Sequence, residues 1–494
     1  MGLFPVLGDE AYYFYWGMHP SAGYYDLPPM IGWWLVPFVK ISLATAWLRL
    51  PNLISLTLIG FSIYEWLKFG VDKPRAKLIA ASFVLLPLPF MAVLMFPDIP
   101  LVLFSYFSAY LFFRAVVAKH DAPLSFLFSG ALLGAAVLSK YYAAFLLPAF
   151  LFWFFLQPNH WRRNLGLVWF FLGGLPFALQ HLIWNQSHCW ANFIFNFVSR
   201  QSVNDGPLYQ ILILFVLYLL VMSFPYLKLA VQKRSKNTVI LDAHSQEWLK
   251  NLEQFLRLVW MIPIFIFGLT ALSGRGQGFH WLMFLLPFFV MWVGLRLSRV
   301  ELSKCFDTLT IATGLLSVVM LMVGLSPERT LGYFFQHRFQ FEFAQITHKD
   351  EWVDALFPDA RRADAIFTEG YTFSSVLNFD LQQYALKNGI ALPEVSVWGS
   401  GSRFGRVFDW TTDFSRLDGK NLMIVTPGPF PETWSHYFTN LKTEARELNG
   451  IPYYVSTGTG FKADLYLKEE FRKPVETYYL HSSAKCSIWD STHS

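Results

Sequence analysis

The chain has few charged residues for its length, and this scarcity excludes most classes of soluble protein. Only 15% of its 494 residues are charged, whereas 54% are hydrophobic and 19% are aromatic. Soluble globular domains carry about 25% charged residues, so the composition predicts a polytopic membrane protein. Cysteine is also rare. Cys189, Cys305 and Cys486 show neither a metal-ligand spacing nor a disulfide framework, although a bridge between Cys189 and Cys486 stays open.

The sequence also lacks a signal peptide ahead of its first polar loop, because residues 1–7 are too few for a charged region followed by an apolar core. We therefore expect either that the chain starts outside the membrane or that a first helix is missing. The net charge of +5 does not indicate a nucleic-acid partner. Lys and Arg stand in short clusters between apolar segments, where such clusters normally set membrane topology.

Apolar stretches of about the 20 residues that a helical span requires predict about ten spans. They cover residues 50–69, 78–96, 99–117, 124–138, 143–156, 165–184, 208–230, 255–272, 279–295 and 306–325. Residues 30–48 are also apolar, but their prolines and their position behind the first loop suit helices lying in the membrane interface as well as a span.

Basic residues cluster in alternate connections between these stretches, which predicts that those connections face the cytoplasm. The clusters are Lys68 to Lys77, Arg114 with Lys119, Arg162 with Arg163, Lys228 to Lys236, and Arg296 to Lys304. The other connections then face outward, and the unusual polar groups fall on that side. Taken singly, each of these polar residues marks only a loop position, but together they share one face of the membrane.

From Ser326 onward, charged residues and turn formers become frequent and no membrane-length run remains, which predicts a soluble domain. Short apolar runs at 365–367, 395–397 and 422–425 alternate with a helical pattern over 373–384, which indicates an α/β layer structure. The glycine-rich segment 399–405 is interpreted as a loop, because its third glycine comes one residue late for a dinucleotide-binding motif.

The chain therefore divides into three expected domains: an external loop with interfacial helices (1–48), a multispan membrane domain (49–325) and an extracytoplasmic α/β domain (326–494). An even number of spans separates the first loop from the last domain, so we expect both on the outer side.

Two adjacent carboxylates, Asp9 and Glu10, begin the first loop, where an acid can act as a general base, bind a cation or stay solvated. Lys140 lies between two apolar stretches, where a deep ammonium costs at least ~2.5 kcal/mol. We expect either an anionic partner for it or a side chain that reaches the interface. Further cations on the outer side are Arg49, Arg200 and Arg275. Carboxylates and cations at one membrane face suit a lipid phosphate and a hydroxyl acceptor, because cations stabilise a leaving phosphate and a carboxylate can take the acceptor's proton.

Seven motifs follow one another over about the first 300 residues: GDEAYY, GYYDLPPMIGWW, LRLPN, FPDIPLVLF, LGAAVLSKYYAAFLLP, IWNQSHCWANFIF and FHWLMFLLP. In this order the chain resembles the integral-membrane glycosyltransferases of GT-C type, which include dolichyl-phosphate-mannose protein mannosyltransferases and the bacterial aminoarabinose transferase of lipid A. The C-terminal domain is similar to the bacterial branch. The resemblance implies a polyprenyl-phosphate-linked sugar donor, an acceptor that approaches from the outer face, and inversion at the anomeric carbon.

The resemblance also implies roles for individual residues. Asp9 matches the acid of the family's first loop and is expected to be the catalytic base, with Glu10 in support. Asp26 matches a second acid that orients donor or acceptor, Asp98 an acid at the outer end of its span, and Lys140 a lysine that contacts the lipid phosphate. Further donor- or acceptor-binding residues are expected at Tyr25, Arg49, Arg200, Arg275 and His280. Leu27 stands where relatives often carry Lys or His, which puts one phosphate or sugar contact in doubt.

We therefore predict a multi-pass glycosyltransferase of the cytoplasmic (inner) membrane, with its active site and C-terminal domain facing the periplasm and with a lipid, glycan or protein as acceptor. No cofactor is expected with certainty, and a divalent metal is the less favoured alternative, because Asp9 and Glu10 have no His or third clustered carboxylate nearby in sequence. Two other classes stay open. One is a transporter or flippase of lipid-linked sugars, which also tolerates ions in the membrane. The other is a membrane-anchored binding or assembly protein whose C-terminal domain, from Ser326 onward, carries the function.

Overall fold

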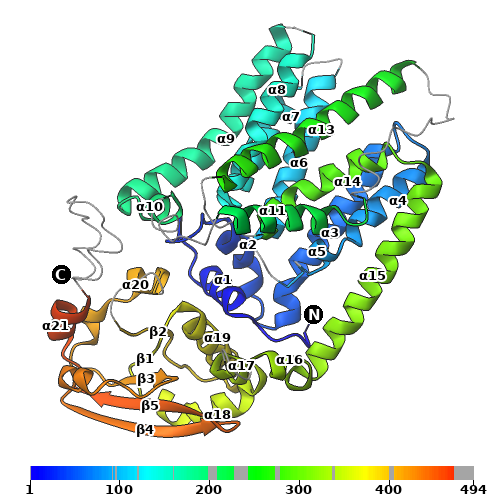
Figure 1. The fold of residues 1–494 in the computed structure, drawn as a ribbon. Helices are drawn as coiled ribbons and strands as arrows, with labels where there is room; N and C mark the ends of the chain where they lie inside the picture. The colour runs from blue at the N-terminus through cyan, green and yellow to red at the C-terminus, as the bar shows by residue number, and fades with distance from the viewer. Residues whose placement is uncertain are drawn as a thin grey trace.

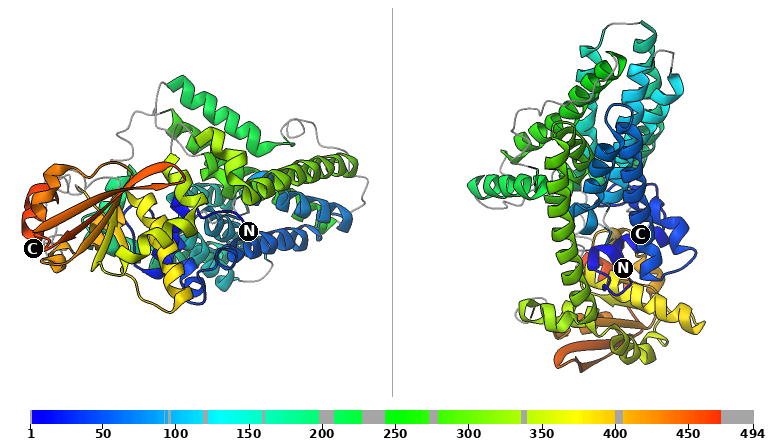
Figure 2. Two further views of the ribbon diagram at one scale, coloured as in Figure 1. Left: turned by 90° about the horizontal axis from the view of Figure 1, so that it is seen from below. Right: turned by 90° about the vertical axis from the view of Figure 1, so that its right-hand side faces the viewer.

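The protein has a long helical part and a smaller part that contains a sheet, with the two first helices lying between them (Figure 1). The structure is a computed structural model, and it describes residues 2–91, 93–94, 97–118, 122–158, 161–197, 208–226, 243–272, 279–335, 340–399 and 405–471. Two further views show the same division, with the helical part on one side and the sheet on the other (Figure 2).

The helical part follows the apolar stretches of the sequence. In chain order it consists of α1 (Gly8–Met18), α2 (Met30–Val39), α3 (Thr45–Leu67), α4 (Lys73–Val84), α5 (Pro87–Met91), α6 (Asp98–Val117), α7 (Pro123–Ser139), the 3₁₀ helix η1 (Tyr141–Phe145), α8 (Leu146–Leu156), α9 (Trp161–Ser187), α10 (Ala191–Phe197), α11 (Leu208–Ser223), α13 (Ala243–Ala271), the 3₁₀ helix η3 (Phe279–Leu285), α14 (Leu286–Gly294) and α15 (Arg299–Leu325).

Among the described residues, five helices are long and apolar enough to cross a membrane. They are α3, α6 and α15 over their full lengths, and the segments Arg163–Ser187 of α9 and Ser245–Thr270 of α13. Several other predicted stretches form shorter apolar helices among the described residues: α2, α7, η1 with α8, and Trp281–Gly294 around α14. The mostly helical membrane fold is thus confirmed, while the number of about ten spans stays a prediction.

The predicted span at 78–96 is not one continuous helix. Asp72 caps α4 by accepting a hydrogen bond from the Arg75 backbone N–H at 3.1 Å, and α4 ends at Val84. A separate short helix, α5, begins at Pro87. Proline lacks a backbone N–H and clashes with the preceding turn, so it breaks an apolar run that is otherwise long enough to span.

Two basic connections that lie far apart in sequence meet at one end of the helical part. The buried guanidinium of Arg75, in α4, donates hydrogen bonds to the carbonyl oxygens of Leu295 at 2.8 Å and Leu297 at 2.5 Å. These carbonyls lie between α14 and α15. The connection between α3 and α4 is therefore joined to the connection between α14 and α15.

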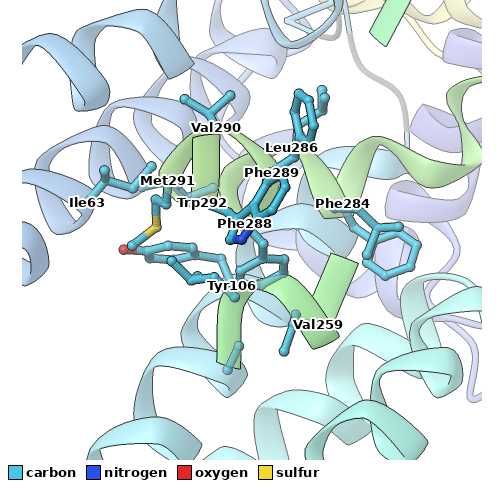
Figure 3. Close-up of a cluster of buried hydrophobic side chains, with 14 of the residues drawn as sticks. Ile63, Tyr106, Val259, Phe284, Leu286, Phe288, Phe289, Val290, Met291 and Trp292 are labelled. Atoms are coloured by element: carbon cyan, nitrogen blue, oxygen red, sulfur yellow. The ribbon is translucent and has the colours of Figure 1, made fainter. Parts of the chain in front are cut away.

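The helices pack through a continuous aromatic core. Tyr106 of α6 stacks on Phe288 of α14 with ring centroids 6.2 Å apart, and Ile63 of α3 and Met291 lie in the same buried cluster (Figure 3). Where α7 crosses α9 the backbones touch, since a Cβ on Gly130 would collide with the carbonyl of Phe170. Close packing of this kind holds the helix ends in fixed relation, and the polar residues at those ends inherit that rigidity.

The C-terminal part is an α/β structure, as its alternating pattern predicts. It contains α16 (Pro327–Phe335), α17 (Gln340–Thr347), α18 (Lys349–Ala360), β1 (Ala365–Thr368), α19 (Tyr371–Asn388), β2 (Val395–Val397), α20 (Val407–Thr411), η4 (Phe414–Leu417), β3 (Leu422–Thr426), η5 (Glu432–Tyr437), β4 (Asn440–Leu448), β5 (Ile451–Thr459), α21 (Ala463–Tyr466) and η6 (Leu467–Phe471).

The strands form one mixed sheet in the order β2-β1-β3-β5-β4. Strands β2, β1 and β3 are parallel, with Phe367 opposite Ser396 on one side and Ile424 on the other. Strands β4 and β5 form an antiparallel hairpin that adds to the β3 edge. Every residue of β3 is buried, which explains why this strand appears in the sequence as an unbroken apolar run.

Helix α1 makes much of the contact between the two parts. Its Phe14 packs on Phe379 of α19 with ring centroids 5.1 Å apart, and its Tyr15 packs on Phe408 of α20 at 4.7 Å. On the opposite side α1 lies against α2, where Gly17 is so close to Leu35 that a Cβ would collide with it. The first loop of the sequence is therefore enclosed between the membrane helices and the C-terminal part.

Candidate functional site

The adjacent acids Asp9 and Glu10 lie on different faces of α1. The Asp9 side chain is exposed, whereas Glu10 is buried. Arg49, at the start of α3, holds Glu10 with two hydrogen bonds, from Nε to Oε1 at 2.7 Å and from Nη2 to Oε2 at 2.6 Å. Of these two carboxylates, only Asp9 is therefore accessible to a substrate.

Arg49 is itself fully buried. Besides Glu10, it donates hydrogen bonds to the backbone carbonyls of Phe4 at 2.8 Å and Pro5 at 2.9 Å. Glu10 also accepts the backbone N–H of Leu7 at 3.3 Å, which caps the start of α1. This bidentate pair holds the N-terminal segment, α1 and α3 together. Glu10 and Arg49 therefore have a structural role.

Asp26 lies at the centre of a second cluster, in the loop between α1 and α2. Its Oδ1 accepts the Tyr12 hydroxyl at 3.2 Å, and its Oδ2 is 2.7 Å from Nη1 of Arg406, just before α20. Burial raises the pKa of the Asp26 carboxyl, and Arg406 acts in the opposite direction. An ion pair between a carboxylate of the first loop and a cation of the C-terminal part thus joins the two parts at the site.

The two clusters are connected through Tyr371, the first residue of α19. Its hydroxyl donates to Oδ1 of Asp9 at 3.0 Å, and its ring lies 3.6 Å from the guanidinium carbon of Arg406. Asp9 and Asp26 are therefore brought together by a stacked Tyr and Arg from a part of the chain about 360 residues away.

Asp98 and Lys140 form a buried ion pair at 2.8 Å, so of the two alternatives for Lys140 the structure shows the anionic partner. Asp98 is the first residue of α6. Lys140 interrupts the helix between α7 and η1 with an extended backbone, at φ −155 and ψ 140. The extended residue turns the chain at this point, which places an ammonium where two helix ends meet.

A chain of polar side chains leads from this lysine toward the first loop. Tyr141 follows Lys140, and its hydroxyl lies 2.6 Å from Nε2 of His181 in α9 and also hydrogen-bonds to Asn192 in α10. Asn192 donates in turn to the backbone carbonyl of Tyr24 at 2.7 Å. One turn later, Asn196 donates to the backbone carbonyl of Asp26 at 3.0 Å. Helix α10 therefore fixes the backbone of the loop that carries Asp26.

The other predicted site residues are less informative. Tyr25 is buried and packs on Phe195 with ring centroids 4.9 Å apart, so its ring forms part of the wall beside Asp26. Arg200 and Arg275 lie outside the described residues, and His280 is described only as part of the η3 backbone. Within the described ranges, no group of three or more His, Cys, Asp or Glu side chains could hold a metal ion.

Sequence reasoning did not identify Arg406 and Tyr371 as site residues. Arg406 directly follows the glycine-rich segment 399–405, which is interpreted only as a loop, and Tyr371 begins a helix whose apolar pattern is its only visible signal. The amides of Asn192 and Asn196 did leave a signal. Asn192 lies inside the motif IWNQSHCWANFIF and Asn196 directly follows it, and their i, i+4 spacing places both on one face of a helix.

Comparisons with known proteins show what the chain is similar to. Residues 26–184 match the family described as dolichyl-phosphate-mannose-protein mannosyltransferase. A curated relative, the lipid A galacturonosyltransferase RgtD of Rhizobium johnstonii, is 25% identical over 182 residues, which cover 36% of this chain and only 38% of that relative's length. The crystal structure of ArnT from Cupriavidus metallidurans bound to undecaprenyl phosphate superposes with a TM-score of 0.58 at 14% identity, covering 92% of this chain and 94% of ArnT.

Proposed function

From this confirmed resemblance to membrane glycosyltransferases that use polyprenyl-phosphate-linked sugars, we propose that the chain transfers a sugar from such a donor to an acceptor hydroxyl. The observation that carries the proposal is the contrast between the exposed Asp9 and the buried, Arg-paired Glu10. A general base has to reach the proton that it removes. Asp9 meets that requirement, and Glu10 keeps the helix that carries Asp9 in place.

The proposed reaction is a direct displacement at the anomeric carbon. The acceptor oxygen forms a bond to that carbon, the bond from the carbon to the phosphate oxygen breaks, and the acceptor proton passes to the Asp9 carboxylate. The polyprenyl phosphate leaves with the electron pair of the broken bond. Because attack and departure take place on opposite faces of the sugar, the product has inverted configuration.

Lys140 is the proposed cation for the leaving phosphate. A buried ammonium is a strong electrostatic partner for charge that develops in a water-poor site. Asp98 holds the ammonium at 2.8 Å and thereby fixes its position before a donor arrives. Asp26 and the wall formed by Tyr25 and Tyr12 are the proposed contacts for the sugar.

We further propose that the site and the C-terminal domain face the outer side of the cytoplasmic membrane. The basic connections joined by Arg75 lie at one end of the helices, and the first loop packs on the C-terminal domain, which the positive-inside rule would assign to the opposite side. Cys189, between α9 and α10, forms a disulfide bond, whereas Cys305 is free. Disulfides persist in oxidising compartments, which supports an outward position for Cys189.

A lipid is the favoured acceptor class, because the curated relative acts on lipid A. The test is mass spectrometry of the lipids of a deletion strain that carries either the wild-type gene, Asp9→Asn or the matched control Asp72→Asn. Asp72 only caps α4. We expect the deletion strain to accumulate a polyprenyl-phosphate sugar, and the wild type and Asp72→Asn, but not Asp9→Asn, to clear it. Clearance by a stably inserted Asp9→Asn protein would remove Asp9 from the mechanism.

A further inference from the structure

The C-terminal domain presents one stacked pair of side chains to the first loop. The guanidinium carbon of Arg406 lies 3.6 Å from the centre of the Tyr371 ring. From this pair, the Tyr371 hydroxyl donates to Asp9 and the Arg406 guanidinium donates to Asp26. Two of the first-loop carboxylates, Asp9 and Asp26, therefore each receive a hydrogen bond from the same small patch of a different domain.

The backbone at Arg406 is held in an unfavourable conformation. Its φ of 50 and ψ of −125 place a long side chain where glycine is the usual residue. Glycine is the preceding residue, Gly405, and not the residue at the strained position itself. Strain of this kind persists only where the surroundings over-determine it, and such outliers cluster at functional sites.

The hydrogen bonding of Arg406 is also incomplete. Its Nη1 is paired with Asp26, but its Nε is buried and has no hydrogen-bond partner among the described residues. An unsatisfied buried donor lowers the stability of the folded state. Arg406 thus has both a strained backbone and a buried N–H without a hydrogen-bond partner among the described residues. Both features lower stability, so stability alone does not explain an Arg at this position.

Arg406 favours the charged form of its neighbour Asp26, against the effect of burial. The groups that act on the Asp26 carboxyl are Arg406 from the C-terminal domain, Tyr12 and Asp9 from α1, and the backbone N–H of Asp26 itself. Burial and Asp9 raise the pKa of Asp26, and Arg406 is the largest of the groups that lower it. Leu27, the next residue of the loop, brings no cation, so the charge that balances Asp26 comes from the other domain.

We propose that Tyr371 and Arg406 are positioning residues, through which the docked C-terminal domain orients Asp9 and supplies the counter-charge of Asp26. The first loop and the membrane helices without the C-terminal domain then carry both carboxylates but not the groups that hold them. This inference rests on the proposed function, because the two acids matter for turnover only if the chain is a transferase. The C-terminal domain is then a part of the site, because it contributes two of the side chains that contact Asp9 and Asp26.

The test compares Arg406→Gly, Arg406→Lys and Arg416→Gln in the full-length protein. Glycine accepts the local backbone conformation, so the first variant removes the guanidinium without adding strain. Lysine restores a charge. Arg416 makes an exposed ion pair with Asp413 in the same domain and is the matched control.

The decisive readout is the pH dependence of kcat/KM. Loss of the guanidinium favours the protonated form of Asp26, so in Arg406→Gly the acidic limb of the profile moves up by about 1–3 pH units, the range typical for removal of a neighbouring opposite charge. Arg406→Lys recovers most of this shift, and Arg416→Gln shows none. A uniform loss of activity at every pH, with an unmoved acidic limb, would overturn the inference.

A second measurement does not depend on activity. Infrared difference titration of the wild type against Asp26→Asn isolates the carboxyl band of Asp26, and in Arg406→Gly this band should titrate at higher pH by a similar amount. If the wild type transfers no sugar but the band shifts, only the proposed function fails. If the wild type is active and the band stays in place, the inference fails alone.

Discussion

The buried ion pair between Asp98 and Lys140 offers the most quantitative prediction. The two charged atoms are 2.8 Å apart, and the side chains are only 1% and 6% exposed. At an effective dielectric of about 20, two unit charges at this distance attract each other by roughly 6 kcal/mol. Much of that attraction offsets the cost of removing both charges from water, and breaking a buried pair by removing one partner typically costs about 3–5 kcal/mol.

We therefore expect Lys140→Met and Asp98→Asn each to lower the free energy of unfolding by about 3–5 kcal/mol, because each leaves the other charge buried without its partner. The double variant should recover most of this loss, since it buries no uncompensated charge. The free energy of unfolding of all four proteins is measured in mixed detergent micelles by tryptophan fluorescence.

Activity separates the structural role of the pair from the chemical one. The double variant should be stable and yet transfer no sugar, because the cation proposed for the leaving phosphate is gone. Two results would refute the reasoning: a double variant whose destabilisation equals the sum of the two singles, or a double variant with wild-type turnover.

Three further predictions concern separate parts of the molecule. Glu10→Gln should lower the free energy of unfolding by about 3–5 kcal/mol, because Arg49 stays buried, while kcat of the folded fraction is unchanged; a large kcat loss at wild-type stability would contradict the architectural role. Burial raises the pKa of Asp380 in α19 to about 7, so the folded state keeps a proton that the unfolded state has lost. The free energy of unfolding should therefore fall as the pH rises from about 4 to about 7, and thermal unfolding should show this slope in the wild type but not in Asp380→Asn. Turnover should be unchanged after dialysis against EDTA, and recovery of lost activity by an added divalent cation would show that the metal alternative is correct.

The fold could be predicted from the sequence wherever one periodic signal dominated. The α/β alternation after Ser326 predicted the ends of β1, β2 and β3 to within one residue. Buried parallel strands consist of short apolar runs, which are easy to recognise in a sequence. The β4–β5 hairpin was not predicted. The residues of β4 are mostly exposed, so the strand carries many charged side chains and no apolar run.

The candidate site could be predicted only in part, for a physical reason. Asp9, Asp26, Asp98 and Lys140 stand out because charge is rare in the first 300 or so residues and costly near a membrane. Arg406 does not stand out, because charged residues are common in its domain. Its importance comes from a contact across about 380 residues of sequence, which no local pattern records.

The central claim is that the chain breaks the bond between a sugar and a polyprenyl phosphate, and vesicles test it most directly. Purified protein reconstituted with a polyprenyl-phosphate sugar and a membrane-lipid extract as acceptor is followed by mass spectrometry. The account predicts that free polyprenyl phosphate appears together with a glycosylated acceptor, and that Asp9→Asn produces neither. Movement of the intact lipid-linked sugar between leaflets, with no free polyprenyl phosphate formed, would contradict the account and identify a flippase.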